Sequence, residues 1–395
     1  MYLTKEEEKI LDGEKGEVLE RMFRLLTRLG DIYGADKMIP VGSVQVAGVS
    51  FKSIGDPGME FLEDFAGKGA MVQVLTYLNP AGMDLEDWDK LGFPKEFAEK
   101  QMRIMNAFKK MGIVITSTCT PYLAGNLPRF REHIAWSESS AVSFANSVIG
   151  ARTNREGGPS ALAAALCGVT PNYGLHLDEN RNPNVVVNVD AVLKFNSNYG
   201  ALGYHVGKQV KKAIPYFKGL SNANTDQLKA LGAAMAASGA VALYYVEDQT
   251  PEANLQDIHG LETIDVGEKE LEETYKKLNT GKELDIVIIG CPHASLREIS
   301  TLAEKVEGKS LTKPVWICTS RMVKEAAQRM GFNDTIEKAG GKIVADTCCV
   351  VSPIEQMGYK TTAVNSGKAA NYLPGFCKQE VIFKDIDNLI QGALK

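Results

Sequence analysis

Three of the seven cysteines in the chain stand directly after short apolar runs that are typical of buried strands. The carboxyl ends of parallel strands are where an open sheet binds its ligands, so thiols at three such ends could share one site. A cysteine that only fills a core is expected inside a strand, as Cys318 is. The three are Cys119, Cys291 and Cys348, after the runs at 113–118, 284–290 and 342–346.

Three converging thiolates favour an iron–sulfur cluster over a structural zinc ion, which prefers four closed ligands. A cluster held by three cysteines leaves one iron open, and an open iron can act as a Lewis acid on a substrate hydroxyl and carboxylate. Cys349 is an alternative to its neighbour Cys348 as the third ligand. The spacing along the chain is long and includes no Cys-x-x-Cys pair, so only the fold could bring the thiols together.

Several polar segments could bind a substrate, and each also has an ordinary structural interpretation. Gly48, Val49 and Ser50 offer backbone N–H groups and a hydroxyl that suit an anion, but they could form a simple glycine turn. Asn79-Pro80 could present an amide or only mark a turn. Arg321 and Lys368, which follow the apolar runs at 315–319 and 361–365, could hold a carboxylate or phosphate, or be surface charges.

One carboxylate precedes a helix that is rich in small residues. Glu138 could act as a general acid or base, or could only cap that helix, and Ser139 adds a hydroxyl beside it. His293 lies two residues after Cys291 and could line the same pocket.

The elements that must position these residues follow a βαβ pattern. Four apolar runs between 284 and 365 alternate with helical patterns, which predicts a doubly wound, mostly parallel sheet in an α/β protein. Thr4 and Glu7 form a capping-box pattern at the start of a helical lead-in. We expect an N-terminal helical and α/β region, a central α/β region with small-residue helices and a C-terminal doubly wound domain, at 1–112, 113–280 and 281–395.

Composition excludes several classes of protein. The 395 residues carry a net charge of −5 and no basic block, which argues against nucleic-acid binding. No signal peptide or membrane-spanning run is present, so a cytoplasmic location is expected. The cysteines are odd in number, which argues against a disulfide framework. No glycine-rich nucleotide-binding motif appears.

Six separated motifs resemble the aconitase X family, and together they extend over nearly the whole chain. They are VQVAGVS from residue 44, TCTPY from 118, WSESSAVSFANSVIGARTNREGGPSALAAAL from 136, GCPHAS from 290, DTC from 346 and NSGKAA from 365.

The resemblance implies an aconitase-like fold, with several α/β units around a central cleft, and a hydro-lyase with a 4Fe–4S cluster. It implies dehydration of (R)-5-phosphomevalonate to trans-anhydromevalonate 5-phosphate in an archaeal mevalonate (isoprenoid) pathway. The family's cluster ligands fall on Cys119, Cys291 and Cys348, with one iron not bound by cysteine. Its substrate-side residues fall on Gly48, Val49, Ser50, Asn79, Pro80, Glu138, Ser139, Ser366 and Lys368.

The resemblance also implies a partner. Relatives of aconitase carry a swivelling domain with a serine that acts as the catalytic base, and this chain stops soon after its last βα unit. We therefore expect a separate small subunit that supplies the serine, in a heterodimer. Two alternatives stay open: dehydration of cis-3-hydroxy-L-proline, as in bacterial relatives, and a non-enzymatic metal-binding scaffold.

Overall fold

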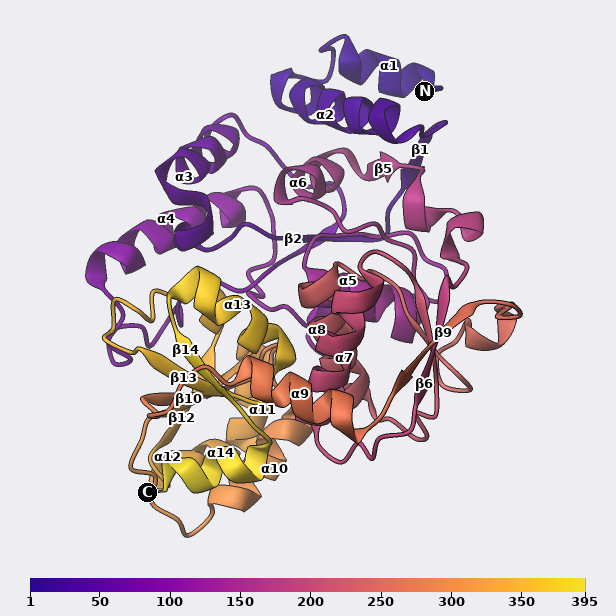
Figure 1. Ribbon diagram of the computed structural model, residues 1–395. Coiled ribbons are helices and arrows are strands. Elements are labelled where there is room, and N and C mark those ends of the chain that lie inside the picture. Colours follow the sequence, from indigo (N-terminus) through magenta and orange to yellow (C-terminus); the bar gives the residue numbers. More distant parts are fainter. Residues whose placement is uncertain (395) are drawn as a thin grey trace.

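The computed structural model describes residues 1–394, whose helices and strands form several α/β units (Figure 1). The predicted α/β class is confirmed. Thr4 and Glu7 do form a capping box, and it starts the first of two lead-in helices, α1 (Lys5–Leu11) and α2 (Glu17–Tyr33). The division at residues 112 and 280 stays a prediction.

The first unit is built around a parallel sheet in the order β3-β2-β4, with a small antiparallel pair β1-β5 beside it. Its strands are β1 (Met38–Pro40), β2 (Ser43–Val46), β3 (Leu75–Leu78), β4 (Ala135–Trp136) and β5 (Val169–Pro171). Its helices are α3 (Phe51–Gly67), α4 (Lys95–Lys110), α5 (Ser139–Phe144) and α6 (Gly158–Cys167).

The segment 113–118, which we predicted as a strand, differs from that prediction. It makes only an isolated bridge, from Val114 to Tyr77 of β3. Further along, the Thr116 hydroxyl accepts the Leu78 N–H at 3.2 Å, and Ser117 has a φ of 41°. The Thr116 side chain thus replaces one backbone hydrogen bond to β3, and the backbone turns at Ser117. Cys119 still lies beside the end of β3, because the Thr118 N–H donates to the Leu78 carbonyl.

The second unit is a parallel sheet in the order β8-β7-β6-β9, covered by two closely packed helices. Alanine at Gly203 of α7 would place its Cβ 2.4 Å from the Leu231 carbonyl of α8, so glycine permits this contact. The strands are β6 (Val185–Val189), β7 (Pro215–Lys218), β8 (Tyr245–Val246) and β9 (Glu262–Val266). The helices are α7 (Asn196–Val210), α8 (Thr225–Gly239) and α9 (Glu268–Leu278).

The third unit is the predicted doubly wound sheet, all parallel, in the order β12-β11-β10-β13-β14. The chain winds outward from β10 in one direction and then returns to its other side, so β10 and β13 flank the switch point. The strands are β10 (Ile286–Ile289), β11 (Val315–Thr319), β12 (Gly341–Ala345), β13 (Thr361–Val364) and β14 (Glu380–Phe383). The helices are α10 (Leu296–Val306), α11 (Arg321–Arg329), α12 (Phe332–Lys338), α13 (Gly367–Cys377) and α14 (Ile386–Ala393).

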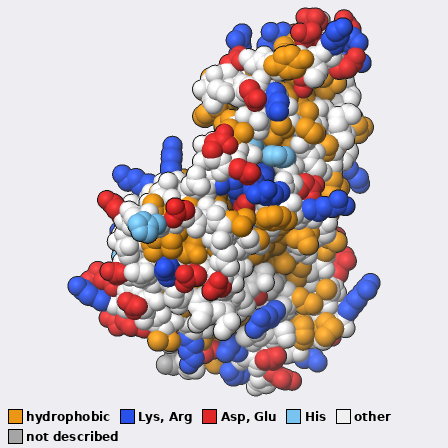
Figure 2. All heavy atoms as spheres, turned by 90° about the vertical axis from the view of Figure 1, so that its right-hand side faces the viewer, with side chains coloured by type: hydrophobic (Ala, Val, Ile, Leu, Met, Phe, Trp, Pro, Cys, Tyr) orange, Lys and Arg blue, Asp and Glu red, His pale blue; other side chains and the backbone are white. Residues whose placement is uncertain are grey.

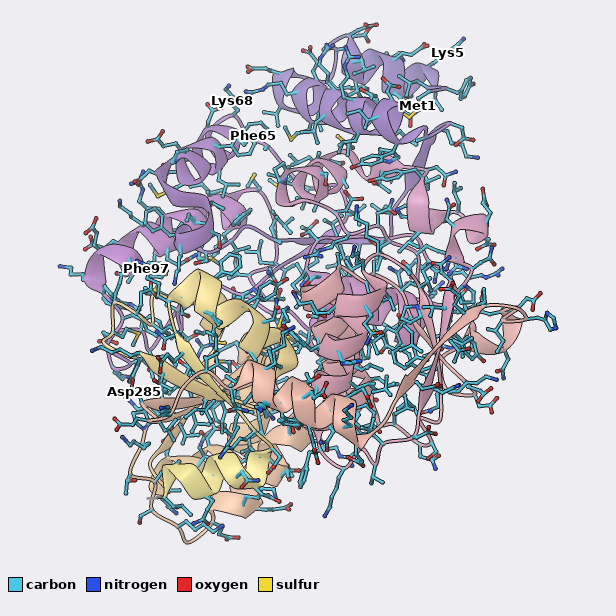
Figure 3. The ribbon with its side chains drawn as sticks, in the orientation of Figure 1. Met1, Lys5, Phe65, Lys68, Phe97 and Asp285 are labelled. Carbon is cyan, nitrogen blue, oxygen red and sulfur yellow. The ribbon has the colours of Figure 1, made fainter. Side chains whose placement is uncertain are left out.

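Buried contacts join the units. Phe97 of α4 belongs to a hydrophobic cluster that also contains Ile288 of β10, and it points toward the third unit (Figure 3). Glu252 of the second unit accepts hydrogen bonds from the buried Arg152 and Arg181. The surface in Figure 2 mixes both signs of charge with apolar side chains. Across residues 1–394, the helices are too short or too polar to cross a bilayer.

The buried His176 predicts how stability depends on pH. Burial, the neighbouring His133 and two arginines lower the pKa of His176 to about 3, so this imidazole stays neutral in the folded protein. An unfolded histidine gains a proton below about pH 6.5, and stability then falls by up to ~1.4 kcal/mol per pH unit toward pH 3. We expect His176→Gln to flatten the loss of unfolding free energy between pH 7 and 5 in urea titrations.

The matched control is His259→Gln, because His259 is exposed. It should keep the wild-type pH dependence. An equally steep loss of stability in the His176 variant would contradict the prediction.

Candidate active site

The three predicted cysteines meet on one side of the third sheet, where the first unit packs against it. Cys291 follows β10 and Cys348 follows β12, while Cys119 comes from the first unit. The Cys119 Sγ accepts the backbone N–H of His293 at 3.2 Å. The Cys348 N–H donates to Ala81 at 3.2 Å, beside Asn79-Pro80. The structure therefore brings the three loops into one region.

His293 ties these loops together. Burial lowers the pKa of His293 to about 4, so its ring is neutral near pH 7. Its Nε2–H then donates to the Thr347 carbonyl at 2.9 Å, and its Nδ1 accepts the Thr118 hydroxyl at 3.0 Å. One side chain two residues after Cys291 thus links the residue before Cys119 to the residue before Cys348. The prediction that His293 lines a pocket with Cys291 stays a prediction.

The thiols differ in how readily they ionise. A hydrogen bond with the Cys349 thiol, helped by the Lys368 ammonium, lowers the pKa of Cys348 to about 7 against the effect of burial. Burial raises the pKa of the Cys119 thiol well above its usual range, although Lys368 opposes the shift. Contacts with Cys291 and Cys348 raise the pKa of Cys349. Of Cys348 and Cys349, the former is therefore the easier to deprotonate, as a metal ligand requires.

A buried ion pair stands beside the sulfurs. Lys368, in the first turn of α13, donates to the Glu138 carboxylate and to the Ser140 hydroxyl at 3.2 Å. Burial alone would favour neutral forms, but Lys368 keeps the pKa of Glu138 low. Glu138 and the sulfurs of Cys291, Cys119 and Cys348 in turn raise the pKa of Lys368 despite its burial.

Glu138 caps a helix and forms an ion pair, while its role as a general acid or base stays a prediction. As the N-cap of α5 it accepts the Ala141 N–H at 2.8 Å, so the capping interpretation is correct. Its carboxylate also accepts the hydroxyls of Ser139, at 3.3 Å, and Ser140, at 2.5 Å. Ser366 caps α13 in the same manner by accepting the Ala369 N–H.

The segments predicted to bind substrate border the cysteine loops. Gly48 has a φ of 79°, and Ser50 caps α3 and donates to Val351 at 2.8 Å, three residues after Cys348. The Val49 carbonyl accepts Gln101 at 2.9 Å. Asn79 has a buried Oδ1 with no partner among residues 1–394.

Arg321 lies behind the Cys348 loop. Its guanidinium donates to Asp84 at 2.6 Å and to Asp346 at 2.5 Å, and it pairs with Glu86 at 3.1 Å. Burial raises the pKa of Asp346 to about 6 even beside this cation. Three carboxylates thus engage Arg321, and it joins the first unit to the third.

Sequence reasoning missed two groups of this region. Ser140 donates to Glu138, but nothing in the run SESS distinguishes its three serines. Tyr122 belongs to the motif TCTPY, and its ring stacks on Phe144 of α5 with centroids 3.9 Å apart. Only the fold reveals that burial and the nearby charges of Cys119 and Glu138 raise the pKa of this tyrosine.

The donor set fits an iron–sulfur cluster better than a single ion. Within residues 1–394, no three His, Cys, Asp or Glu side chains are arranged to ligate one metal ion. A cluster binds each thiolate through a different iron, so its ligands need not converge on one point. The positive charge of Lys368 and the lowered pKa of Cys348 both favour the thiolate form that binds iron.

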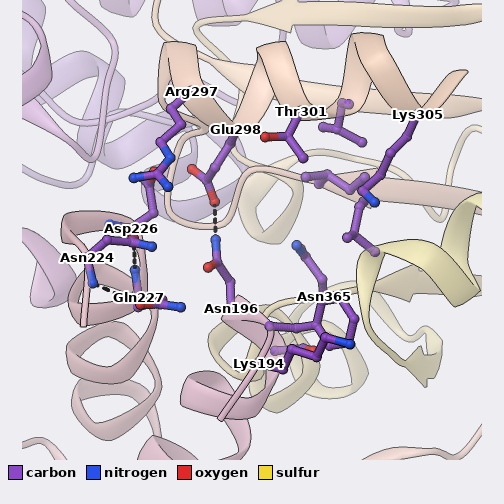
Figure 4. Close-up of a pocket in the computed structure, with 15 residues that line it drawn as sticks. Lys194, Asn196, Asn224, Asp226, Gln227, Arg297, Glu298, Thr301, Lys305 and Asn365 are labelled. Carbon is purple, nitrogen blue, oxygen red and sulfur yellow. Dashed lines mark hydrogen bonds between the residues drawn. The ribbon is translucent and has the colours of Figure 1, made fainter. Parts of the chain in front are cut away.

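A separate cavity of about 260 Å³ lies between the second and third units (Figure 4). Its wall includes Asp226 and Glu298, both paired with the buried Lys229. Lys229 also donates to the His293 carbonyl at 3.0 Å, so this ion network lies behind the histidine. None of the cysteines lines the cavity.

Comparison with known proteins identifies the family. Models described as the aconitase X first, second and third domains match residues 1–179, 183–276 and 284–395. The chain belongs to the aconitase X family. The expected relationship is confirmed. The crystal structure of Thermococcus kodakaraensis aconitase X in its holo-form is 52% identical and covers both chains fully, with a TM-score of 0.94.

Curated members of the aconitase X family have two kinds of name. The phosphomevalonate dehydratase large subunit of Methanocaldococcus jannaschii is 60% identical over 99% of this chain and 100% of its own. The cis-3-hydroxy-L-proline dehydratase of Pseudomonas aeruginosa is 33% identical over 98% of this chain but only 69% of its own. The hydroxyproline enzyme therefore extends beyond the part that matches this chain.

The buried ion pair of this aconitase X chain predicts a strong effect of Lys368→Met. Removing the ammonium leaves Glu138 buried without its cation, which typically destabilises a fold by about 3–5 kcal/mol. The double variant Lys368→Met/Glu138→Gln should recover much of this loss, because no buried charge remains unpaired. Denaturant titration of the three proteins measures both effects.

Lys95→Met is the control, since Lys95 pairs with Glu99 on the surface, where the two side chains are 80% and 63% exposed. It should change stability by less than about 1 kcal/mol. A double variant no more stable than Lys368→Met would contradict the account of the pair.

Proposed function

We propose that this chain is the large subunit of a two-subunit hydro-lyase that dehydrates (R)-5-phosphomevalonate to trans-anhydromevalonate 5-phosphate in the mevalonate pathway of isoprenoid synthesis. The observation that carries the proposal is the 60% identity, over the full length of both chains, to a phosphomevalonate dehydratase large subunit. The meeting of three cysteine loops around a buried lysine and glutamate supports it.

The proposed cofactor is an iron–sulfur cluster of the 4Fe–4S type, held by Cys119, Cys291 and Cys348. The holo-form of the Thermococcus relative supports a bound cofactor in the family, and the donor set of this chain suits thiolate ligation. When bound, such a cluster supplies a Lewis acid that can weaken the C–O bond of a substrate hydroxyl.

The chain's own residues would bind and orient the substrate. Lys368 is a permanent cation that can hold a substrate carboxylate and stabilise negative charge next to it. Glu138 is the fixed counter-charge that keeps this lysine in place. Ser139 donates a hydrogen bond to Glu138, and Ser366 caps α13 beside Lys368. The proposed substrate site also includes Gly48, Val49, Ser50, Asn79 and Pro80, in the loops that border the cysteines.

Arg321 has a different part in the proposal. Because carboxylates of both units already engage it, we assign it to positioning the Cys348 loop. The base that removes the substrate proton is proposed to be a serine of a small swivel-domain subunit. The name "large subunit" of the Methanocaldococcus relative supports such a partner. The assembled pair is expected in the cytoplasm.

The cluster assignment predicts the effect of replacing each cysteine. Cys119→Ser, Cys291→Ser and Cys348→Ser should each lower iron and sulfide content after anaerobic purification. Activity should fall by more than the roughly 10–100-fold that is typical of losing an outer-shell partner. Cys349→Ser should keep most of the iron, which would settle the choice between the adjacent cysteines.

Cys167→Ser is the matched control, because Cys167 ends α6 and packs in the core of the first unit. It should keep wild-type iron and activity. Survival of both cluster and activity in Cys119→Ser would favour the scaffold alternative.

The substrate assignment predicts selectivity between two hydroxy acids. The chain reconstituted with its small subunit should dehydrate mevalonate 5-phosphate with a kcat/KM at least ~100-fold above that for cis-3-hydroxy-L-proline, since binding groups left unpaired by a wrong substrate cost this much or more. A reversed preference would assign the chain to the hydroxyproline reaction.

A further inference from the structure

Tyr122 places an unused hydrogen-bond donor beside the cysteine loops. Its side chain is 9% exposed, and its buried hydroxyl has no hydrogen-bond partner among residues 1–394. Buried hydroxyls in native proteins nearly always have a partner, so each exception requires a physical explanation. Burial raises the pKa of Tyr122, and the charges of Cys119, Glu138 and Asp226 raise it further, so these groups of the candidate site and of the ion network behind it lie within electrostatic range of the hydroxyl.

The ring of Tyr122 is held in place. It lies parallel to Phe144, with the ring planes 8° apart, within a buried cluster that also contains Trp136. Pro121 precedes it in the short turn that follows Cys119. The hydroxyl therefore cannot swing toward a distant acceptor without breaking this stack.

The nearby acceptors of the chain already have donors. The Glu138 carboxylate accepts Lys368, two serine hydroxyls and the Ala141 N–H. Asp226 accepts Ser295 at 2.9 Å and pairs with Lys229 at 3.1 Å. The Cys119 Sγ accepts the His293 N–H. Each carboxylate also has its own ammonium, so the Tyr122 hydroxyl is left as a donor without an acceptor.

We propose that the Tyr122 hydroxyl donates a hydrogen bond to a negatively charged oxygen of the bound substrate, next to Cys119 and Glu138. The inference rests on the proposed function, because it takes the substrate to be a hydroxy acid that binds between these residues. Tyr122 then touches the substrate, as a further binding residue of the reaction, and the hydroxyl gains its partner only in the complex.

Tyr122→Phe tests the proposal by removing only the hydroxyl. With mevalonate 5-phosphate and the reconstituted two-subunit enzyme, kcat/KM should fall about 10- to 100-fold, the range for one hydrogen bond to a charged acceptor. The thermal midpoint of the substrate-free protein should stay the same or rise, since an unpaired buried hydroxyl is lost. Iron content, sulfide content and the electron paramagnetic resonance spectrum should match the wild type.

Tyr244→Phe is the matched control. Tyr244 is also fully buried and lies near Tyr122, but its hydroxyl donates to the Leu228 carbonyl at 2.9 Å. This variant should lower the thermal midpoint and leave kcat/KM within about twofold, the opposite of the Tyr122 result, because it removes a buried hydrogen bond of the folded protein.

Two results would overturn the proposal. A lower thermal midpoint in Tyr122→Phe with unchanged kcat/KM would mean that the folded protein itself uses the hydroxyl. A changed cofactor spectrum or content would mean that the hydroxyl contacts the cofactor instead. If the wild-type pair does not dehydrate mevalonate 5-phosphate, the proposed function fails, and the same comparison on cis-3-hydroxy-L-proline decides the role of Tyr122.

Discussion

The ion pair of Lys368 and Glu138 determines how this site is built. Two buried charges stay ionised only when they pair with each other and when further hydrogen bonds satisfy their remaining donors and acceptors. Here the ammonium also donates to Ser140, and the carboxylate accepts the Ala141 N–H in the first turn of α5. The pair joins α13 of the third unit to α5 of the first, so the site's charge depends on correct packing of both.

The ordering of the third sheet explains why that pair lies beside the cysteines. Cys291 follows β10 and Lys368 follows β13, the two strands on either side of the switch point. Loops after such strands diverge to opposite faces and leave room for a ligand between them. The first unit adds Cys119 to this region. His293 links the Cys119 loop to the Cys348 loop by hydrogen bonds to Thr118 and Thr347.

The sequence alone predicted the parts of this arrangement that depend on local pattern. The doubly wound sheet, the capping box at Thr4 and the position of cysteines after apolar runs all follow from periodicity and residue type. The sequence could not predict that Glu138 pairs with Lys368, because the two residues are 230 positions apart and only the packing of the fold brings them together. The sequence also could not show the partners of Arg321. The three carboxylates that pair with it lie in other loops, so from the sequence it remained a candidate substrate ligand. The segment 113–118 has strand-forming residues and keeps two backbone hydrogen bonds to β3, yet the Thr116 hydroxyl replaces the ladder bond between them.

The origin of the sulfurs in widely separated parts of the chain has a consequence for how the protein matures. Domains emerging from a ribosome fold in order from the N-terminus. Cys119 is then in place long before Cys348 and Lys368 leave the exit tunnel. The cluster proposed above would need all three thiols, so it would assemble only after the third unit has emerged from the ribosome.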